Sequence, residues 1–146
     1  YCKRFYIFFI PEDIYQTFYV VHQATLTCVS TAAQIAGAAA LRDGDEEVEK
    51  MRKAYAERRN FLIPELEKLG FEIATPNGAF YLFIKIPEGQ NQDSREFALE
   101  IARKAGVGFI PGEAFGEHGQ GYLRMSYASS MEDLEEGVQR LNAYLG

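Results

Sequence analysis

An arginine in the middle of a predicted strand is the side chain in this sequence best suited to chemistry. Side chains of a strand alternate between faces, so residues 122–127 place Arg124 on a polar face with Tyr122 and Ser126. A guanidinium there can hold a carboxylate through two parallel, charge-assisted hydrogen bonds. An ion pair with a carboxylate on one of the protein's own helices is the alternative, and the strand pattern by itself leaves both open.

Two glycine-containing segments precede this strand. Residues 78–81 read Gly-Ala-Phe-Tyr after a Pro-Asn pair, and residues 111–121 form a glycine-rich loop. Each has a simple structural explanation, with Gly78 as a turn residue of positive φ and with Phe80 and Tyr81 as core aromatics of a hairpin. Because the loop adjoins the strand of Arg124, it is also a candidate rim of a binding site.

Composition narrows the classes of function. The 146 residues are 47% hydrophobic and 14% aromatic, which favours one compact domain that buries a core. A net charge of -6 disfavours nucleic acid and anionic membrane surfaces as partners. No apolar run reaches the length of about 18 residues that a membrane span needs. Two cysteines and two separated histidines indicate neither a disulfide scaffold nor a metal site, which favours a cytoplasmic protein.

Hydrophobic periodicity predicts helices in the first half of the chain. Residues 5–10 are β-prone and stop at Pro11, where a helix begins that runs into the early twenties. The Ala- and Gly-rich run at 31–41 predicts a closely packed, buried helix. Asp45 caps a long amphipathic helix that Pro64 should kink and that Gly70 ends.

The period then changes from about 3.6 to 2, which predicts a ββαββα unit. A hairpin over residues 71–86 turns at Pro76-Asn77-Gly78, and a helix follows that Asp93 or Ser94 caps. A short strand at 107–110, the glycine-rich loop and the strand of Arg124 lead to a last helix, opened by Ser130 and Asp133. The predicted fold is α+β, with a small, mainly antiparallel sheet covered by helices.

Three ordered motifs carry a family resemblance. They are Gly-Ala-Phe-Tyr at 78–81, Ile-Pro-Gly-Glu-Ala-Phe-Gly at 110–116 and Gly-Tyr-Leu-Arg-Met-Ser-Tyr-Ala at 121–128. In this order and spacing, residues 10–146 resemble the C-terminal region of class I/II (fold type I, aspartate-aminotransferase-like) aminotransferases, which depend on pyridoxal 5′-phosphate (PLP). The resemblance implies one small domain over 1–146, in which residues 1–10 are a divergent remnant of the large-domain edge.

The same resemblance implies roles for individual residues. Arg124 grips the α-carboxylate of an amino acid or 2-oxo acid, and Tyr81 and the glycine-rich loop form the mouth of the site. A homodimer with composite sites is implied, to which residues 19–31 contribute from the neighbouring subunit. The amino donor stays open, with aspartate only the commonest family label.

Cofactor binding is where the sequence departs from the family. Counting back from Pro11, the phosphate-binding arginine falls on Arg4, whose neighbours do not match, so a solvated arginine is the alternative. The Schiff-base lysine would lie before residue 1, and Lys3 is in the wrong register. No other lysine is placed to lose its proton easily. We therefore expect no catalytic residue here and a chain that is inactive alone; the alternative is a non-catalytic folding or dimerisation domain.

Overall fold

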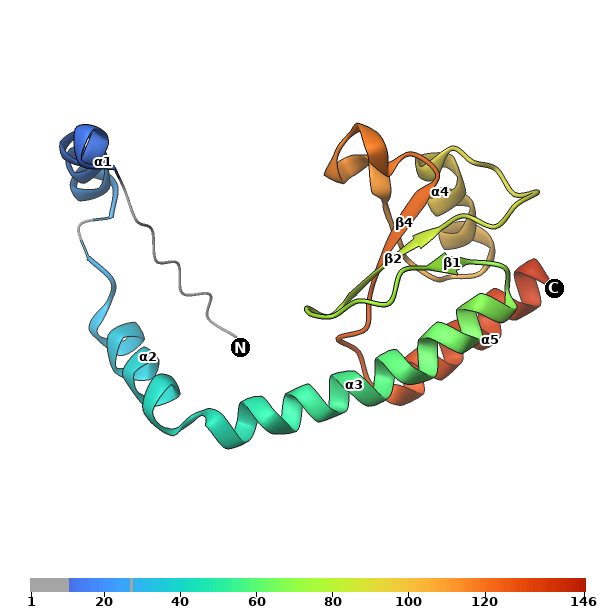
Figure 1. Ribbon diagram of the computed structural model, residues 1–146, viewed down its shortest axis with the longest axis horizontal. Coiled ribbons are helices and arrows are strands. Elements are labelled where there is room, and N and C mark those ends of the chain that lie inside the picture. Colours follow the sequence, from blue (N-terminus) through green and yellow to red (C-terminus); the bar gives the residue numbers. More distant parts are fainter. Residues whose placement is uncertain (1–10, 27) are drawn as a thin grey trace. The chain divides into compact units, whose positions relative to one another are not determined.

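The computed structural model describes residues 11–26 and 28–146, and the chain divides into two compact units, residues 1–50 and 51–146 (Figure 1). The expected single domain over 1–146 stays a prediction. The predicted strand at 5–10, the remnant at 1–10 and Arg4 lie outside the described residues.

The described residues of the first unit form two helices, α1 (Glu12–Thr25) and α2 (Thr31–Asp43), and the beginning of a third. Ser30 caps α2, since its side chain accepts a hydrogen bond from the backbone N–H of Ala33. The prediction that α2 is buried is wrong, because Gly37 is its only buried residue. Small side chains permit close packing, but they need a surface to pack against, and most of α2 is exposed in the described part of the chain.

Helix α3 (Asp45–Lys68) runs through Pro64 as one helix (Figure 1). Proline removes one backbone donor from the helix interior. The buried side chains of Leu62 and Leu66 lie on either side of it and tie this stretch of α3 to the core of the second unit.

A Schellman motif ends α3 at Gly70, as predicted. Gly70 has a φ of +88°, and its N–H donates to the carbonyl of Glu67 at 3.0 Å. The N–H of Phe71 donates to the carbonyl of Leu66 at 3.2 Å, and both side chains enter the core. The turn therefore aims the chain from the helix directly into the sheet.

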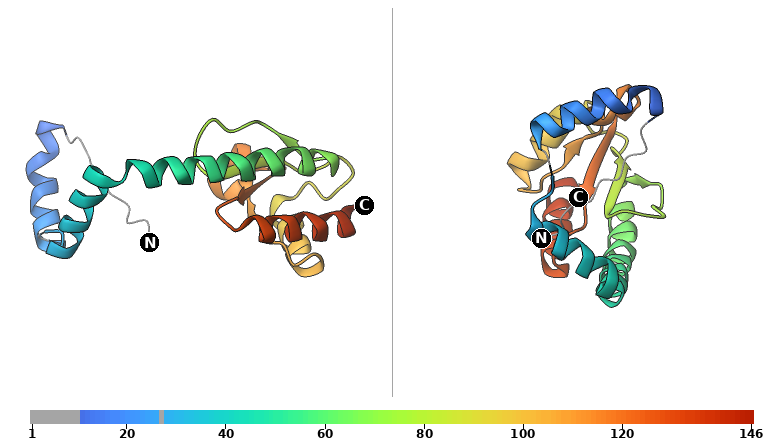
Figure 2. Two further views of the ribbon diagram at one scale, coloured as in Figure 1. Left: turned by 90° about the horizontal axis from the view of Figure 1, so that it is seen from below. Right: turned by 90° about the vertical axis from the view of Figure 1, so that its left-hand side faces the viewer.

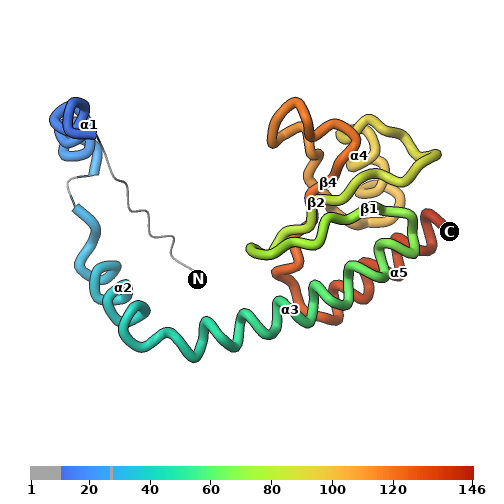
Figure 3. The backbone as a smooth tube through the Cα atoms, in the orientation of Figure 1, coloured from blue at the N-terminus to red at the C-terminus, as the bar shows by residue number. Residues whose placement is uncertain are grey.

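The second unit contains the predicted ββαββα order, which Figure 3 traces along the backbone. Its sheet has the strand order β1-β2-β4-β3, and each neighbouring pair is antiparallel. The strands are β1 (Glu72–Ile73), β2 (Tyr81–Lys85), β3 (Ile110–Pro111) and β4 (Tyr122–Ser126), and the helices are α4 (Ser94–Lys104) and α5 (Met131–Leu145). The α+β class is confirmed.

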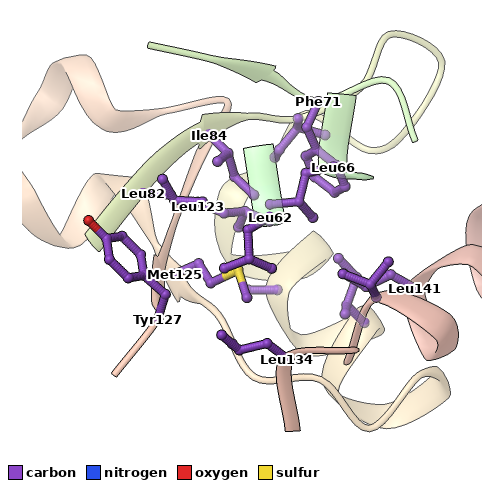
Figure 4. Packing of buried hydrophobic residues seen from close by; sticks show 14 of the residues in the cluster. Leu62, Leu66, Phe71, Leu82, Ile84, Leu123, Met125, Tyr127, Leu134 and Leu141 are labelled. Carbon is purple, nitrogen blue, oxygen red and sulfur yellow. The ribbon is translucent and has the colours of Figure 1, made fainter. Parts of the chain in front are cut away.

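Helices cover one face of this sheet. Within the second unit, α3 and α5 run alongside each other in both views (Figures 1 and 2), and α4 contacts β3, β4 and α5. Figure 4 shows the core that they enclose. Its central members are Leu62, Leu66, Leu82, Ile84, Phe97, Ile101, Leu123 and Leu141, none of which is exposed. The opposite face of the sheet carries the polar side of β4.

Side-chain caps fix the starts of α4 and α5. Asp93 accepts from the N–H groups of Arg95 and Glu96, and Ser130 accepts from the N–H of Asp133 at 3.1 Å. Both caps agree with the sequence prediction. Among the described residues, no helix is long and apolar enough to cross a membrane.

Candidate functional site

The polar face of β4 is built as strand alternation predicts. Leu123, Met125 and Tyr127 are at most 7% exposed and point into the core, whereas Arg124 is only partly buried. In the register of the sheet, Arg124 lies opposite Phe83 of β2 and Ile110 of β3. Since β4 has a neighbour on each side, the backbone that carries Arg124 is held along both edges.

Two aromatic rings enclose the Arg124 side chain. Its Cζ atom lies 4.4 Å from the ring centroid of Tyr81 and 4.1 Å from that of Phe115. We call Tyr81 and Phe115 the aromatic clamp. Both distances are well within the range of a cation–π interaction.

No carboxylate pairs with Arg124 in the described part of the chain, and its guanidinium donates no hydrogen bond there. The described residues thus offer no internal ion pair, the alternative that the strand pattern left open. A partly buried cation stacked on rings keeps the N–H groups at its edge available. Such an edge matches the two oxygens of a carboxylate.

Tyr81 is placed by the turn before β2. Its ring packs on that of Phe80 at 4.5 Å between centroids. The predicted positive φ occurs in this turn at Ala79, with a φ of 61°, and Gly78 does not adopt one. The Tyr127 hydroxyl donates to the Ala79 carbonyl at 3.0 Å, which holds the turn against β4, and burial raises the pKa of Tyr127. This long-range hydrogen bond is made to the same residue that takes the left-handed conformation.

Phe115 is placed by the glycine-rich loop, residues 111–121. Within the loop, Gly112–Phe115 and Glu117–Gly119 form two short 3-10 helices. The backbones of Gly112 and Gly119 touch, so that a Cβ added to either would collide with the carbonyl oxygen of the other. Glycine at both positions is therefore a steric requirement, and this contact folds the loop so that Phe115 reaches Arg124.

Ser94 ties the loop to β4. Its side chain is fully buried, accepts hydrogen bonds from the N–H groups of Gly121 at 2.8 Å and Tyr122 at 3.2 Å, and donates to the carbonyl of Gly119 at 3.3 Å. Sequence reasoning treated Ser94 only as a possible helix cap. Its function in the loop could not be predicted, because the three groups that it joins are 25 to 28 residues away.

Further aromatic side chains continue the open face beyond the clamp. The ring of Phe83 stacks on Tyr122 with 5.2 Å between centroids and meets Phe115 edge to face at 6.5 Å. A hollow of about 340 Å³ beside this pair is lined also by Lys85 and Glu72. The aromatic clamp around Arg124 thus continues, through Phe115, into a partly exposed aromatic surface.

The described lysines are not suited to form a Schiff base with PLP. Four of them, Lys50, Lys68, Lys85 and Lys104, pair with glutamates within 2.7 Å, and Lys53 is exposed. The hydrogen bond to Glu72 raises the pKa of Lys85, and the one to Glu100 raises the pKa of Lys104. A Schiff-base lysine needs the opposite shift, because only the neutral amine attacks the aldehyde. No group of three potential metal ligands occurs in the described residues.

Comparisons with known proteins all lead to one enzyme family. The family model "Aminotransferase class I and II" matches residues 8–141. Aspartate aminotransferase from Pyrococcus horikoshii is 38% identical over 138 residues, which cover 92% of this chain and 35% of that protein. LL-diaminopimelate aminotransferase from Aquifex aeolicus is 44% identical over 110 residues, covering 75% of this chain and 28% of the relative.

Solved structures agree with the sequence relatives. An aromatic aminotransferase from Pyrococcus horikoshii has a TM-score of 0.84 and 37% identity, and the match covers 92% of this chain and 36% of that one. The chain thus spans about a third of the length of the proteins that it matches. The substrates for which these relatives are named differ at similar identity, so the comparisons leave the amino donor open.

Proposed function

Because this chain belongs to the class I and II aminotransferases, we propose that it is the small-domain portion of a PLP-dependent enzyme that moves an amino group between an amino acid and a 2-oxo acid. In that enzyme Arg124 holds the α-carboxylate of the substrate. The observation that carries this proposal is the Arg124 guanidinium, which is stacked between two rings and has no carboxylate partner among the described residues.

Arg124 contributes binding and alignment. Two hydrogen bonds from a fixed guanidinium set both the position and the rotation of a carboxylate, and this determines where the attached Cα and amino group lie. Tyr81 lines the mouth of the site from β2. Aspartate is one possible donor, and we leave the choice of donor open.

The proposal is tested by binding of a 2-oxo acid to the full chain, followed through the side-chain ¹H and ¹⁵N NMR signals of Arg124. We expect 2-oxoglutarate to shift these signals with a dissociation constant on the order of 10 mM, since two charge-assisted hydrogen bonds at an open site are worth only a few kcal/mol. Arg124→Gln should abolish the response at the neighbouring Tyr81 ring.

Arg140→Gln is the matched control, because Arg140 is an exposed arginine paired with Glu136 at 2.6 Å. Equal 2-oxoglutarate binding by the wild-type chain and Arg124→Gln would remove Arg124 from the proposed site.

We further propose that the chain does not transaminate alone. PLP supplies the electron sink of the reaction when it is held and oriented. The glutamate-paired lysines support this part of the proposal, as none of them is prepared for covalent attachment. Mixing the chain with PLP, reducing with borohydride and mapping the adduct by mass spectrometry provides the test. One stoichiometric adduct at a single lysine would contradict it.

A homodimer is the proposed assembly, with residues 19–31 contributing to the neighbour's site. Helix α1 supports it, because Tyr19, Val20 and Val21 are 48%, 62% and 57% exposed. Sedimentation equilibrium should give twice the chain mass, and Val21→Asp should give the monomer. A second candidate, a non-catalytic dimerisation domain, would show this dimer without any 2-oxo acid binding at Arg124.

Partners other than a carboxylate substrate and a second copy are not proposed. The net charge of -6 is the support for excluding nucleic acid and anionic membranes, and tight binding to duplex DNA or anionic vesicles would contradict it.

We also propose a cytoplasmic location. The unbridged, exposed thiol of Cys28 is consistent with a reducing compartment. Cell fractionation tests it.

A further inference from the structure

We propose that Phe115 is a positioning residue for the carboxylate site: together with Tyr81 it fixes the Arg124 guanidinium so that only the N–H edge remains open to a ligand. This inference rests on the proposed function, because it assigns a second residue to the same site. It concerns a side chain on the glycine-rich loop, at a distance of 4.1 Å from the Arg124 Cζ atom.

The geometry places the cation between two rings. Tyr81 and Phe115 approach Arg124 to 4.4 and 4.1 Å, yet the two rings make no contact with each other in the described structure. Two rings over one face of a guanidinium would lie against each other. The rings of the clamp therefore cover different sides of the guanidinium, and the approach that remains is along its edge.

Two contacts other than the one with Arg124 hold Phe115 in position. The backbone contact between Gly112 and Gly119 shapes the loop, and the edge-to-face contact with Phe83 holds the ring laterally. Its ring is nevertheless 51% exposed, so burial in the core does not explain why the loop presents an aromatic side chain at this point. The contact with Arg124 does explain it.

Fixing the guanidinium before a ligand arrives has an energetic consequence. A long arginine side chain loses rotamer freedom when it forms two hydrogen bonds, and this loss weakens binding. Because the aromatic clamp already restricts the Arg124 side chain in the free protein, little further rotamer freedom is lost when a ligand binds. A ring on each side also keeps water and other anions from the faces of the cation, while the in-plane donors stay accessible.

The alternative is that Phe115 is only a surface aromatic that covers the arginine stem. Leucine would serve that purpose equally well, since it is apolar and of similar reach, but it has no π-system. Tyrosine would keep the ring. Comparing Phe115→Leu with Phe115→Tyr therefore separates apolar cover from ring stacking.

The test uses the full chain and two NMR readouts. The first is the upfield ring-current shift of the Arg124 Cδ and Nε protons in the free protein, which we expect in the wild type, retained in Phe115→Tyr and reduced in Phe115→Leu. The second is the 2-oxoglutarate concentration at half-saturation. We expect it to rise about 2- to 30-fold in Phe115→Leu, and to stay within about twofold in Phe115→Tyr.

Amide exchange at Gly112 and Tyr122 shows whether the loop keeps its fold in each variant. With the loop intact, a normal half-saturation concentration in Phe115→Leu would overturn the positioning role and leave the proposed function standing. The positioning role alone also fails if the wild type lacks the ring-current shift but binds 2-oxoglutarate. If the shift is present and the wild type binds no 2-oxo acid, the proposed function fails, and the positioning role fails with it.

Discussion

Replacing Ser94 by alanine is expected to lower the free energy of unfolding of the second unit by about 3–5 kcal/mol. The hydroxyl accepts from the N–H groups of Gly121 and Tyr122 and donates to the carbonyl of Gly119. Ser94 is fully buried, so alanine leaves these groups without a partner. Each buried polar group left unsatisfied costs about 1–3 kcal/mol, and the two longer bonds, at 3.2 and 3.3 Å, belong at the low end of that range.

Ser130→Ala provides a matched control. It also removes one serine hydroxyl that accepts from a backbone N–H, but at the exposed start of α5, where the loss of a cap costs about 1 kcal/mol. Urea unfolding followed by both circular dichroism and tyrosine fluorescence measures the two variants. Coincident transitions are required before the free energies are compared.

Hydrogen exchange gives a local readout of the same perturbation. The amides of Gly121 and Tyr122 should exchange faster in Ser94→Ala, and those inside α5 should not change beyond the global loss of stability. A free-energy loss no larger than that of Ser130→Ala, with unchanged exchange at both amides, would refute the claim that the Ser94 hydroxyl holds the loop to β4.

Two further outcomes follow from the loop and the turn. Gly112→Ala should lower the free energy of unfolding by about 1–3 kcal/mol or more, because the added Cβ meets the backbone of Gly119. The control is Gly137→Ala on α5, whose Cβ enters open space and should raise the free energy of unfolding by roughly 0.5–1 kcal/mol. Urea unfolding measures both variants, and a neutral result for both would contradict this prediction. Burial raises the pKa of Tyr127, so the folded state favours the neutral phenol. The contribution of Tyr127 to the free energy of unfolding is therefore full below pH 10 and is lost as the pH rises further. Between pH 9 and pH 11, Tyr127→Phe should therefore lose less free energy of unfolding than the wild type does. A pH profile of stability identical to that of the wild type would contradict this reasoning.

Local signals made most of the second unit predictable. Residues 122–127 alternate in polarity, and this was enough to place Arg124 on the face away from the core. Asp93, Ser130 and Gly70 marked helix ends correctly, because caps depend on hydrogen bonds within a few residues.

Long-range contacts explain what the sequence could not predict. The positive φ falls on Ala79 instead of Gly78, in a turn where the Ala79 carbonyl accepts a hydrogen bond from a tyrosine 48 residues away. The stacking of Phe115 on Arg124 depends on a loop shape that two touching glycines create. Helix α2 has the composition of a buried helix, yet burial depends on a packing partner, which composition does not supply.

The short edge strands of the sheet disfavour fibril formation. Its outer strands, β1 and β3, are each only two residues long, and β3 ends in Pro111, which has no N–H to donate. Growth of amyloid-like fibrils requires a long row of unpaired backbone groups as a template for incoming strands. This sheet offers almost none, even though its open face displays several partly exposed aromatic rings. Copies of this unit that stick together should therefore do so through side chains, as amorphous or specific assemblies, and the sheet should not extend from one molecule to the next.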